Sequence, residues 1–158
     1  MTKNLRIREA KLDNIDIRLL YALTADSRTS IAELARSLSM SAPSVSERVH
    51  RLEESGVIER FTIETEHKLL GYSLAFYIRI RPFPGQQPKV VALITATEQI
   101  VECDRITGDD CFIAKVFVKS TAELERILDQ LIPYAQTNTS MIQSCLVKRR
   151  LPPMGESK

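Results

Sequence analysis

The sequence predicts an α+β protein in which a short all-helical domain precedes a domain of the form βαββαβ. Two observations carry this fold class. In the first 60 residues, apolar side chains recur at helical spacing in three short runs that are separated by polar turns. From Tyr72 onward, the patterns run in the order strand, helix, strand, strand, helix, strand, which is the order of a ferredoxin-like, four-stranded antiparallel sheet with both helices on one face.

The change of pattern also divides the chain into segments. At 158 residues, of which 44% are hydrophobic, the chain can build one ordinary domain or two small ones. We expect two, with the boundary near residues 62 to 72, where a β-branched stretch ends at Gly71. The expected segments are a helical domain over 1–63, a linker over 64–72, a sheet domain over 73–150 and a flexible tail over 151–158.

Helix-capping residues place the first two helices. Asp13 is an N-cap residue at the start of "LDNIDIRLLYALTADSR", with Asp16 in the first turn. Ser30 and Glu33 form a capping box around "SIAELARSL", which predicts a helix of about eight or nine residues. Each of these helices carries a single apolar stripe, as expected of a helix with one buried face.

A third helix is expected after the turn "SMS". Ser41 can cap it, and Pro43 lies within its first turn, where the missing N–H costs little. Gly56 supplies the stop, so the helix should end near Ser55. The alternating, β-branched segment 57–69 then predicts a small hairpin or wing.

The second half of the chain alternates strand and helix patterns. Residues 72–83 form a strand with two different faces, because apolar side chains alternate with mixed ones. The remaining expected elements are a helix over 89–99, a strand over 100–107, a tight turn over 108–110, a strand over 111–119, a helix over 120–134 and a strand over 139–150. Because both helices cover one face of the sheet, the uncovered face should pair with a second copy of the chain.

Composition excludes several classes of protein. No apolar run approaches the roughly 20 residues that a membrane span needs, and the N-terminal 16 residues carry charges where a signal peptide would be apolar. We therefore expect a cytoplasmic protein with no membrane partner. The three cysteines are an odd number without a CxxC pair, so we expect neither a disulfide framework nor a metal site, and no cofactor. A net charge of +2 does not by itself indicate a nucleic-acid partner.

The second and third helices, joined by a short turn, predict a (winged) helix-turn-helix whose third helix enters the major groove of DNA. This helix needs only a thin apolar edge, made of Val45, Val49 and Leu52, and the rest of its surface is polar. Short hydroxyls, arginines, Glu47 and His50 can meet base edges and phosphates. The alternative is an ordinary helical hairpin with a solvated face. The candidate DNA-binding residues are Ser41, Pro43, Ser44, Ser46, Glu47, Arg48, His50 and Arg51.

Both halves of the chain carry motifs of one known family. The N-terminal motifs are "LD..D..LL..L..D.R", "ELA", "S...V..RV..LE..GVI" and a closing "LG". Together they closely resemble the DNA-binding domain of the Lrp/AsnC family of transcription regulators. "TGDDCF" and "TNTSMIQSCLVK" are similar to parts of that family's sensing domain, so the resemblance extends from Leu12 to about Arg150. It implies a homodimer that pairs through its sheet face and assembles further, often into octamers, on operator DNA.

The resemblance also implies a small effector, usually an amino acid, bound near the loop between the second and third strands. Gly108 permits a close backbone approach, carboxylates can hold an ammonium group, and backbone N–H groups can take a carboxylate. The commonest family form is Gly-Asp-aromatic-Asp, whereas here Asp110 and Cys111 replace the last two residues. The alternative is a plain hairpin turn. The candidate effector-binding residues are Thr107, Gly108, Asp109, Asp110, Thr139 and Ser140.

The sequence leaves three functions to compare. The resemblance favours a sequence-specific transcription regulator whose activity or oligomeric state responds to a small effector. The alternative is an effector-independent, architectural DNA-binding protein, which would show weak sequence preference. An enzyme is not expected, because the sequence offers no convincing acid–base pair, nucleophile arrangement or phosphate loop. A dimeric regulator would place its two recognition helices about 34 to 36 Å apart, or a multiple of that, on a roughly palindromic operator.

Overall fold

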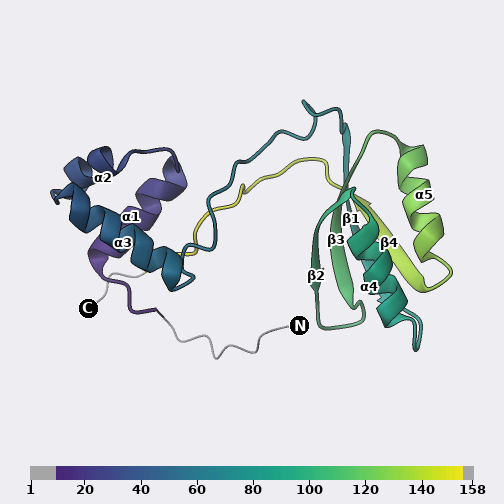
Figure 1. Cartoon of the computed structure of the whole chain (residues 1–158). Coiled ribbons are helices and arrows are strands. Elements are labelled where there is room, and N and C mark those ends of the chain that lie inside the picture. Colours follow the sequence, from purple (N-terminus) through teal and green to yellow (C-terminus); the bar gives the residue numbers. More distant parts are fainter. Residues whose placement is uncertain (1–9, 155–158) are drawn as a thin grey trace. The chain divides into compact units, whose positions relative to one another are not determined.

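The computed structural model describes residues 10–154, which form two compact units. One unit contains the residues up to Ile63 together with those from Val147 onward, and the other contains the residues between them. The elements drawn in Figure 1 are α1 (Asn14–Ala25), α2 (Ile31–Leu38), α3 (Ala42–Glu54), β1 (Leu74–Pro82), α4 (Gln87–Ala96), β2 (Ile100–Arg105), β3 (Phe112–Val118), α5 (Thr121–Leu131) and β4 (Ala135–Met141). None of the helices in this described part has the length and hydrophobicity of a membrane span.

Local capping defines the three helices of the first unit. The side chain of Asp13 accepts the backbone N–H of Asp16, and the Asp16 side chain accepts that of Asp13, which closes a capping box at α1. Ser30 and Glu33 form the same reciprocal pair at α2. The Ser41 side chain caps α3. The three predicted N-caps are therefore confirmed.

The apolar stripes of the three helices meet in one core. Leu19, Leu34 and Val45, one from each helix, are essentially fully buried. The turn between α2 and α3 passes through Ser39, whose φ of 56° lies in the left-handed region, and the Ser39 N–H bonds back to the end of α2. This turn allows α3 to follow α2 directly, so the predicted helix-turn-helix arrangement is confirmed.

Segment 57–69 contains no strand, so the predicted hairpin or wing is wrong. Ile58 instead packs on the helical core, and its backbone N–H donates to the Leu52 carbonyl at 2.9 Å. Farther along, the side chains of Phe61 and Ile63 are exposed. A two-stranded hairpin without a buried face is marginal in water. Alternation of apolar residues was therefore not sufficient to form one here.

The C-terminal segment packs within the helical unit. Leu151 and Met154 contact the core formed by the three helices, and the Met154 backbone N–H donates to the Tyr21 hydroxyl oxygen at 3.4 Å. The tail expected over 151–158 thus has apolar contacts as far as Met154, because these side chains have a core on which to pack. The last four residues of that tail lie outside the described chain.

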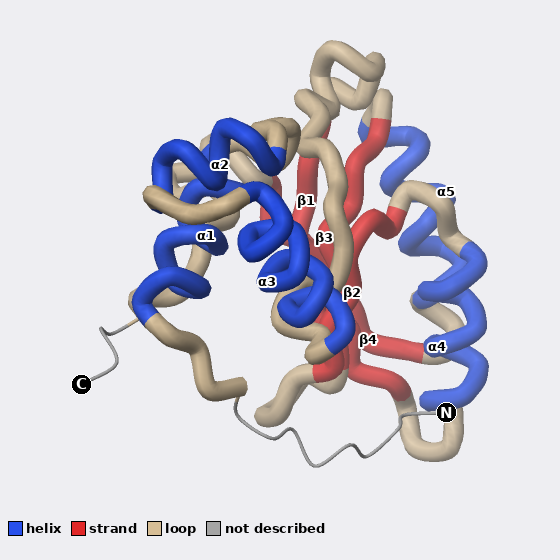
Figure 2. The backbone as a smooth tube through the Cα atoms, turned by 60° about the vertical axis from the view of Figure 1, so that its left-hand side comes forward, coloured by secondary structure: helices blue, strands red, loops and turns tan. Residues whose placement is uncertain are grey.

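The second unit is a four-stranded antiparallel sheet in the order β2-β3-β1-β4. Figures 1 and 2 show α4 and α5 along the same face of this sheet. Val90 of α4 and Leu131 of α5 join Ile78 and Ile80 of β1 in one buried core between helices and sheet. The predicted sheet with two helices on one face is confirmed.

The last strand lies earlier in the chain than predicted. β4 ends at Met141, which pairs with Phe76 near the beginning of β1. Because β1 begins only two residues before Phe76, a strand that continued to residue 150 would run past the end of its partner, so the prediction of a strand over 139–150 is wrong. At its other end, β4 begins at Ala135 and continues through polar residues, among which asparagine is depleted in strands and threonine is enriched. The polar residues 136–138 therefore lie in the sheet, although the sequence pattern placed them between the expected helix and the expected strand.

Candidate functional site

The polar face of α3 lies above a narrow buried edge formed by Val45 and Leu52. The structure leaves most predicted DNA-binding side chains exposed, namely Ser41, Pro43, Ser46, Glu47, His50 and Arg51. It partly buries the other two, Ser44 and Arg48. A shallow hollow on this face is lined by Met40, Ser44, Glu47, Arg48, His50, Arg51 and Glu54. The predicted residues outside this hollow are Ser41, Pro43 and Ser46.

The N-terminus of α3 combines small side chains with the partial positive charge of a helix end. The Ser41 hydroxyl oxygen accepts the Ser44 backbone N–H at 3.4 Å and lies 2.8 Å from the Ser44 hydroxyl. Pro43 lies in the first turn and gives up no hydrogen bond there. The first backbone N–H groups of a helix carry partial positive charge and lack partners within the helix. This end of α3 can therefore accept a phosphate.

Two arginines of α3 are held by acidic residues at the start of α1. Nη1 of Arg48 lies 2.7 Å from Asp13 Oδ2 and 2.7 Å from Asp16 Oδ1. Nη2 of Arg51 lies 2.9 Å from each carboxylate oxygen of Asp16. Hydrogen bonds to Asp13 and Asp16 raise the pKa of Arg48. The pKa of Asp13 is lowered, first by the backbone N–H of Asp16 and then by Arg48.

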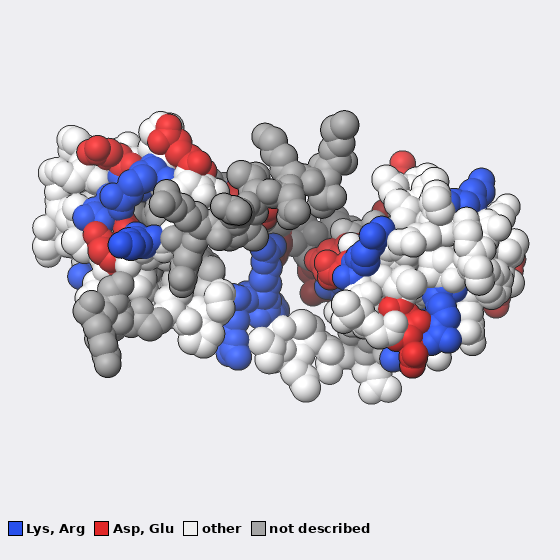
Figure 3. Space-filling model, turned by 90° about the horizontal axis from the view of Figure 1, so that it is seen from below, with Lys and Arg blue, Asp and Glu red and all other residues white. Residues whose placement is uncertain are grey.

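The exposed face of α3 carries charges of both signs. His50 Nε2 lies 3.2 Å from Glu54 Oε1, and the carboxylate of Glu47 is exposed nearby. In the view of Figure 3, basic and acidic side chains lie next to one another over the helical unit. A face of this kind offers no broad basic patch to phosphates, so its DNA affinity depends on a few placed contacts.

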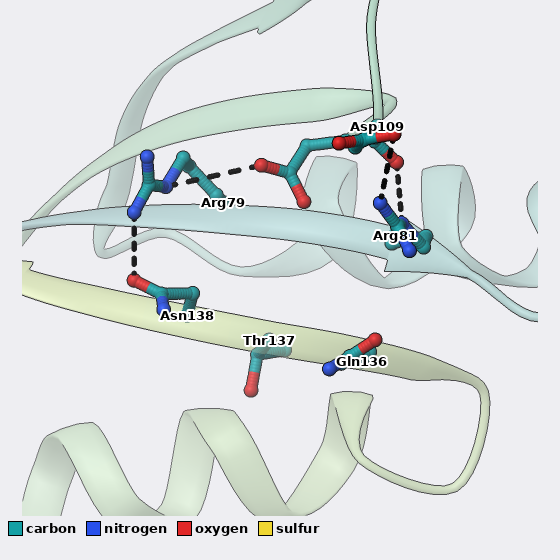
Figure 4. Close-up of a pocket in the computed structure, with 7 residues that line it drawn as sticks. Arg79, Arg81, Asp109, Gln136, Thr137 and Asn138 are labelled. Atoms are coloured by element: carbon teal, nitrogen blue, oxygen red, sulfur yellow. Dashed lines mark hydrogen bonds and ion pairs between the residues drawn. The ribbon is translucent and has the colours of Figure 1, made fainter.

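The sheet unit carries a second hollow, which is open and polar. Its volume is about 290 Å³, close to the lower end of small-molecule sites, and it is lined by Arg79, Arg81, Asp109, Asp110, Gln136, Thr137 and Asn138. Figure 4 shows that β1 and β4 supply side chains from neighbouring strands, while Asp109 comes from the loop after β2. The hollow thus gathers two cations, two anions and amide groups.

Long ion pairs connect the charges of this hollow. Arg79 Nε lies 3.8 Å from Asp110 Oδ2, and Arg81 Nη2 lies 3.5 Å from Asp109 Oδ1. Arg79 also donates from Nη2 to Asn138 Oδ1 at 3.0 Å, and Arg81 Nε donates to the Asp109 carbonyl (Figure 4). Both arginines keep donors directed to solvent, because about half of each side chain is exposed.

Of the predicted effector-binding residues, Asp109 and Asp110 line the hollow. The predicted residues that do not line it are Thr107, Gly108, Thr139 and Ser140. Gly108 has a φ of +113°, a conformation that L side chains rarely adopt, so its role is to let the loop turn. Thr139 and Ser140 lie farther along β4 than the hollow, because the strand begins four residues earlier than expected.

Sequence reasoning missed the residues that the two strands contribute. Arg79 and Arg81 occupy alternate positions on the mixed face of β1, so their period of two was a usable signal. Gln136 and Asn138 had no such signal, because the strand containing them was predicted to start at Thr139. Within residues 10–154, no group of three or more His, Cys, Asp or Glu side chains is placed to hold a metal ion.

Models of known families match both units of the chain. An AsnC-type helix-turn-helix domain matches residues 12–53, and an Lrp/AsnC ligand-binding domain matches residues 75–152. The first match covers the α2–α3 pair, and the second covers the whole sheet.

Known proteins are similar over most of the chain. The transcriptional regulator LrpC of Bacillus subtilis is 35% identical over 134 residues, which are 85% of this chain and 93% of that protein. The solved structure of B. subtilis LrpC has a TM-score of 0.83 at 34% identity and covers 89% of this chain and 100% of its own. A feast or famine regulatory protein of M. tuberculosis, solved in complex with L-methionine, has a TM-score of 0.82 at 28% identity over 90% of this chain and 99% of its own. The chain therefore belongs to the Lrp/AsnC family of helix-turn-helix transcription regulators.

Proposed function

We propose that this protein is a sequence-specific regulator that acts in the cytoplasm, binds operator DNA as a homodimer, and changes its DNA binding or assembly when an amino acid binds. The observation that carries the proposal is the polar face of α3, which is exposed above a narrow apolar edge. A helix that needs so little of its surface for packing has the rest available for the major groove.

Different parts of this face suit different parts of DNA. The hydroxyl of Ser46 and the ring of His50 are exposed at positions where they can meet base edges. Glu47 accepts hydrogen bonds and suits the amino group of cytosine, whereas it repels phosphate. The partial positive charge at the N-terminus of α3 suits a phosphate. Two copies of α3 about 34 to 36 Å apart, or a multiple of that, would read a roughly palindromic operator.

The uncovered sheet face supports the proposed homodimer. Tyr77 is 41% exposed on the face that α4 and α5 leave open. Ile113 and Phe117 project from the same face, because they pair in register with Arg79 and Ala75. A surface that mixes apolar and charged side chains in this way suits a self-complementary, two-fold contact. Further assembly of dimers, up to an octamer, is part of the proposal.

The polar hollow supports an amino-acid effector. A ligand that carries an ammonium and a carboxylate group can bind Asp110 through the first and Arg79 or Arg81 through the second. The ion pairs there are long and solvated, so a ligand can replace them at low cost. Each side chain lining this hollow is polar, which favours an effector with a polar side chain over an aliphatic one. The related M. tuberculosis structure is a complex with L-methionine.

Fluorescence anisotropy tests both parts of the proposal. The protein is titrated onto the duplex upstream of its own gene and onto a shuffled duplex, over a range of salt concentrations, with each common amino acid added in turn. We expect tighter binding to the native duplex and a shift by one amino acid or a small group of them. Equal, salt-sensitive binding to both duplexes that no amino acid changes would instead favour the effector-independent architectural function.

A pair of variants ties the response to the hollow. Asp110→Ala removes a lining carboxylate and should abolish the response to the amino acid. Asp129→Ala makes the same change of charge on the exposed surface of α5, outside the hollow, and should keep the response. A response that survives in Asp110→Ala would exclude Asp110 from the effector site.

A further inference from the structure

Asp16 is the one buried charged side chain in the described part of the chain, with 2% of its surface exposed. Burying a carboxylate is costly unless it is paired and hydrogen-bonded. Here its two oxygens accept the Asp13 backbone N–H and hydrogen bonds from Arg48 and Arg51. The start of α1 is thereby tied to the middle of α3, the helix proposed to enter DNA.

The two arginines use their donors differently. Nη1 of Arg48 bridges Asp13 and Asp16 at 2.7 Å each, and the Arg48 side chain is only 21% exposed. Arg51 bonds to Asp16 through Nη2 alone, and its side chain is 58% exposed. Nε and Nη1 of Arg51 make no hydrogen bond to the described residues, so they remain available to an external acceptor.

A guanidinium group is planar and presents five N–H donors in a rigid fork. Holding one nitrogen of the fork against both oxygens of a carboxylate restricts the directions in which the remaining donors can point. Arg51 is therefore oriented before DNA arrives, and less side-chain freedom is lost when it binds. The side chain of Arg48, in contrast, has little exposed surface, and it would have to break two ion pairs to contact DNA.

We propose that Asp16 is a positioning residue that separates the roles of the two arginines. It locks Arg48 into an ion pair that holds α3 against α1, and it orients Arg51 so that the free edge of the guanidinium contacts a DNA phosphate. This assignment rests on the proposed DNA binding. It replaces the prediction that both arginines contact DNA.

The salt dependence of DNA binding tests this division, because log affinity falls as log salt rises and each lost phosphate contact reduces the magnitude of that slope by about 0.9. Arg51→Ala should reduce the magnitude of the slope by about one per recognition helix, and Arg51→Lys should restore most of that magnitude. Arg48→Gln should leave the slope unchanged, although it should lower the urea midpoint of unfolding. Arg126→Ala, which removes a cation exposed on α5, is the charge control and should leave both unchanged.

Asp16→Asn tests the positioning role directly. The amide has nearly the same shape as the carboxylate but pairs weakly with two guanidinium groups. We expect a severalfold loss of affinity for the operator while the slope stays that of the wild type, because Arg51 remains present but is no longer oriented. Measurements are made at a temperature where circular dichroism shows the variant to be folded.

The outcomes separate this inference from the proposed function. A wild-type slope in Arg51→Ala, or a loss of one unit of slope in Arg48→Gln, would overturn the division of roles while DNA binding itself stands. If the wild-type protein binds no duplex at low salt, the proposed function fails and the inference fails with it.

Discussion

Each unit of the molecule holds two arginines against two aspartates, and the two clusters differ in their access to water. The helical cluster consists of Asp13, Asp16, Arg48 and Arg51. The sheet cluster consists of Arg79, Arg81, Asp109 and Asp110. In the helical cluster, Asp16 is 2% exposed and the ion pairs measure 2.7–2.9 Å. In the sheet cluster, the Asp109 side chain is 96% exposed and the pairs measure 3.5–3.8 Å.

The comparison shows that the same residue types form one cluster around a buried carboxylate and another that is open to solvent. Under the proposed function, the first cluster holds two helices together and the second binds the effector. A buried carboxylate that loses its cations is left uncompensated, so the helical cluster resists any change of partner. An exposed pair gains little over its separate, hydrated ions, so a ligand can take the place of either member. Asp16 is more deeply buried than either aspartate of the sheet cluster, and this difference separates the two proposed roles.

Loss of the buried carboxylate should have the largest effect. Asp16→Ala removes the partner of two guanidinium groups and should lower the free energy of unfolding by about 3 kcal/mol. Asp110→Ala, the matched change in the sheet cluster, should cost less than about 0.5 kcal/mol. Urea unfolding followed by circular dichroism measures both, and similar losses in the two variants would show that burial does not distinguish the clusters.

Loss of an arginine from the sheet cluster should weaken binding of the effector without unfolding the protein. Arg81→Ala removes donors from the sheet cluster and should raise the dissociation constant of the amino acid at least tenfold, or about 1.4 kcal/mol. Isothermal titration calorimetry with the amino acid identified by anisotropy gives this constant. Arg126→Ala serves as the control for lost positive charge. Equal affinity in Arg81→Ala and wild type would argue against this hollow as the receptor.

Lowering the pH should reduce the stability of the helical unit, because Asp13 becomes protonated. The pKa of Asp13 lies below its ordinary value of 3.8 because the Asp16 N–H and Arg48 favour the ionised form. Its contribution to stability is present above that ordinary value and is lost as the pH falls through the lower pKa of the folded state. Since the side chain is 51% exposed, the loss should stay below about 1 kcal/mol.

The comparison with Asp13→Asn isolates this contribution. Unfolding of the variant in urea between about pH 5 and pH 2.5 should depend less steeply on pH than that of the wild type. Asp129→Asn, on exposed α5, should follow the wild type. Parallel curves for wild type and Asp13→Asn would remove Asp13 from the acid response.

The smallest effect is expected at Thr139. Its position on β4 lies opposite Ile78 and outside the hollow. Thr139→Val keeps the shape of the side chain and removes only the hydroxyl, so the dissociation constant of the effector should change by less than about twofold. A tenfold change in the dissociation constant, measured by the same calorimetry, would indicate that Thr139 belongs to the effector site and that this site extends along β4 beyond the hollow.

Signals within a few residues predicted the local structure well. The capping pair of Ser30 and Glu33 and the cap at Ser41 could be located from spacing alone, because both partners of each bond lie within one turn. The same reasoning failed for segment 57–69, where alternation indicated strands. Strands need a partner and a buried face, and neither is supplied there.

The candidate sites were predicted only in part, for a related reason. Asp109 and Asp110 stood out because they share one loop. Gln136 and Asn138 reach the same hollow only through the pairing of β4 with β1, which the expected strand boundaries concealed. Register is a property of two strands, so neither strand alone specifies it.

By itself, the sequence determined the fold class, the capped helices, the order of strands and helices, and the family, because these depend on local spacing and motifs. Only the tertiary structure decided which charges meet. Asp16 and Arg48 are separated by 32 residues, and nothing in their local sequence favours an ion pair over a DNA contact. The packing of α3 on α1 brings the two side chains together and excludes water from Asp16, and this loss of solvation is the basis of the proposed role of Arg48 in holding the two helices together.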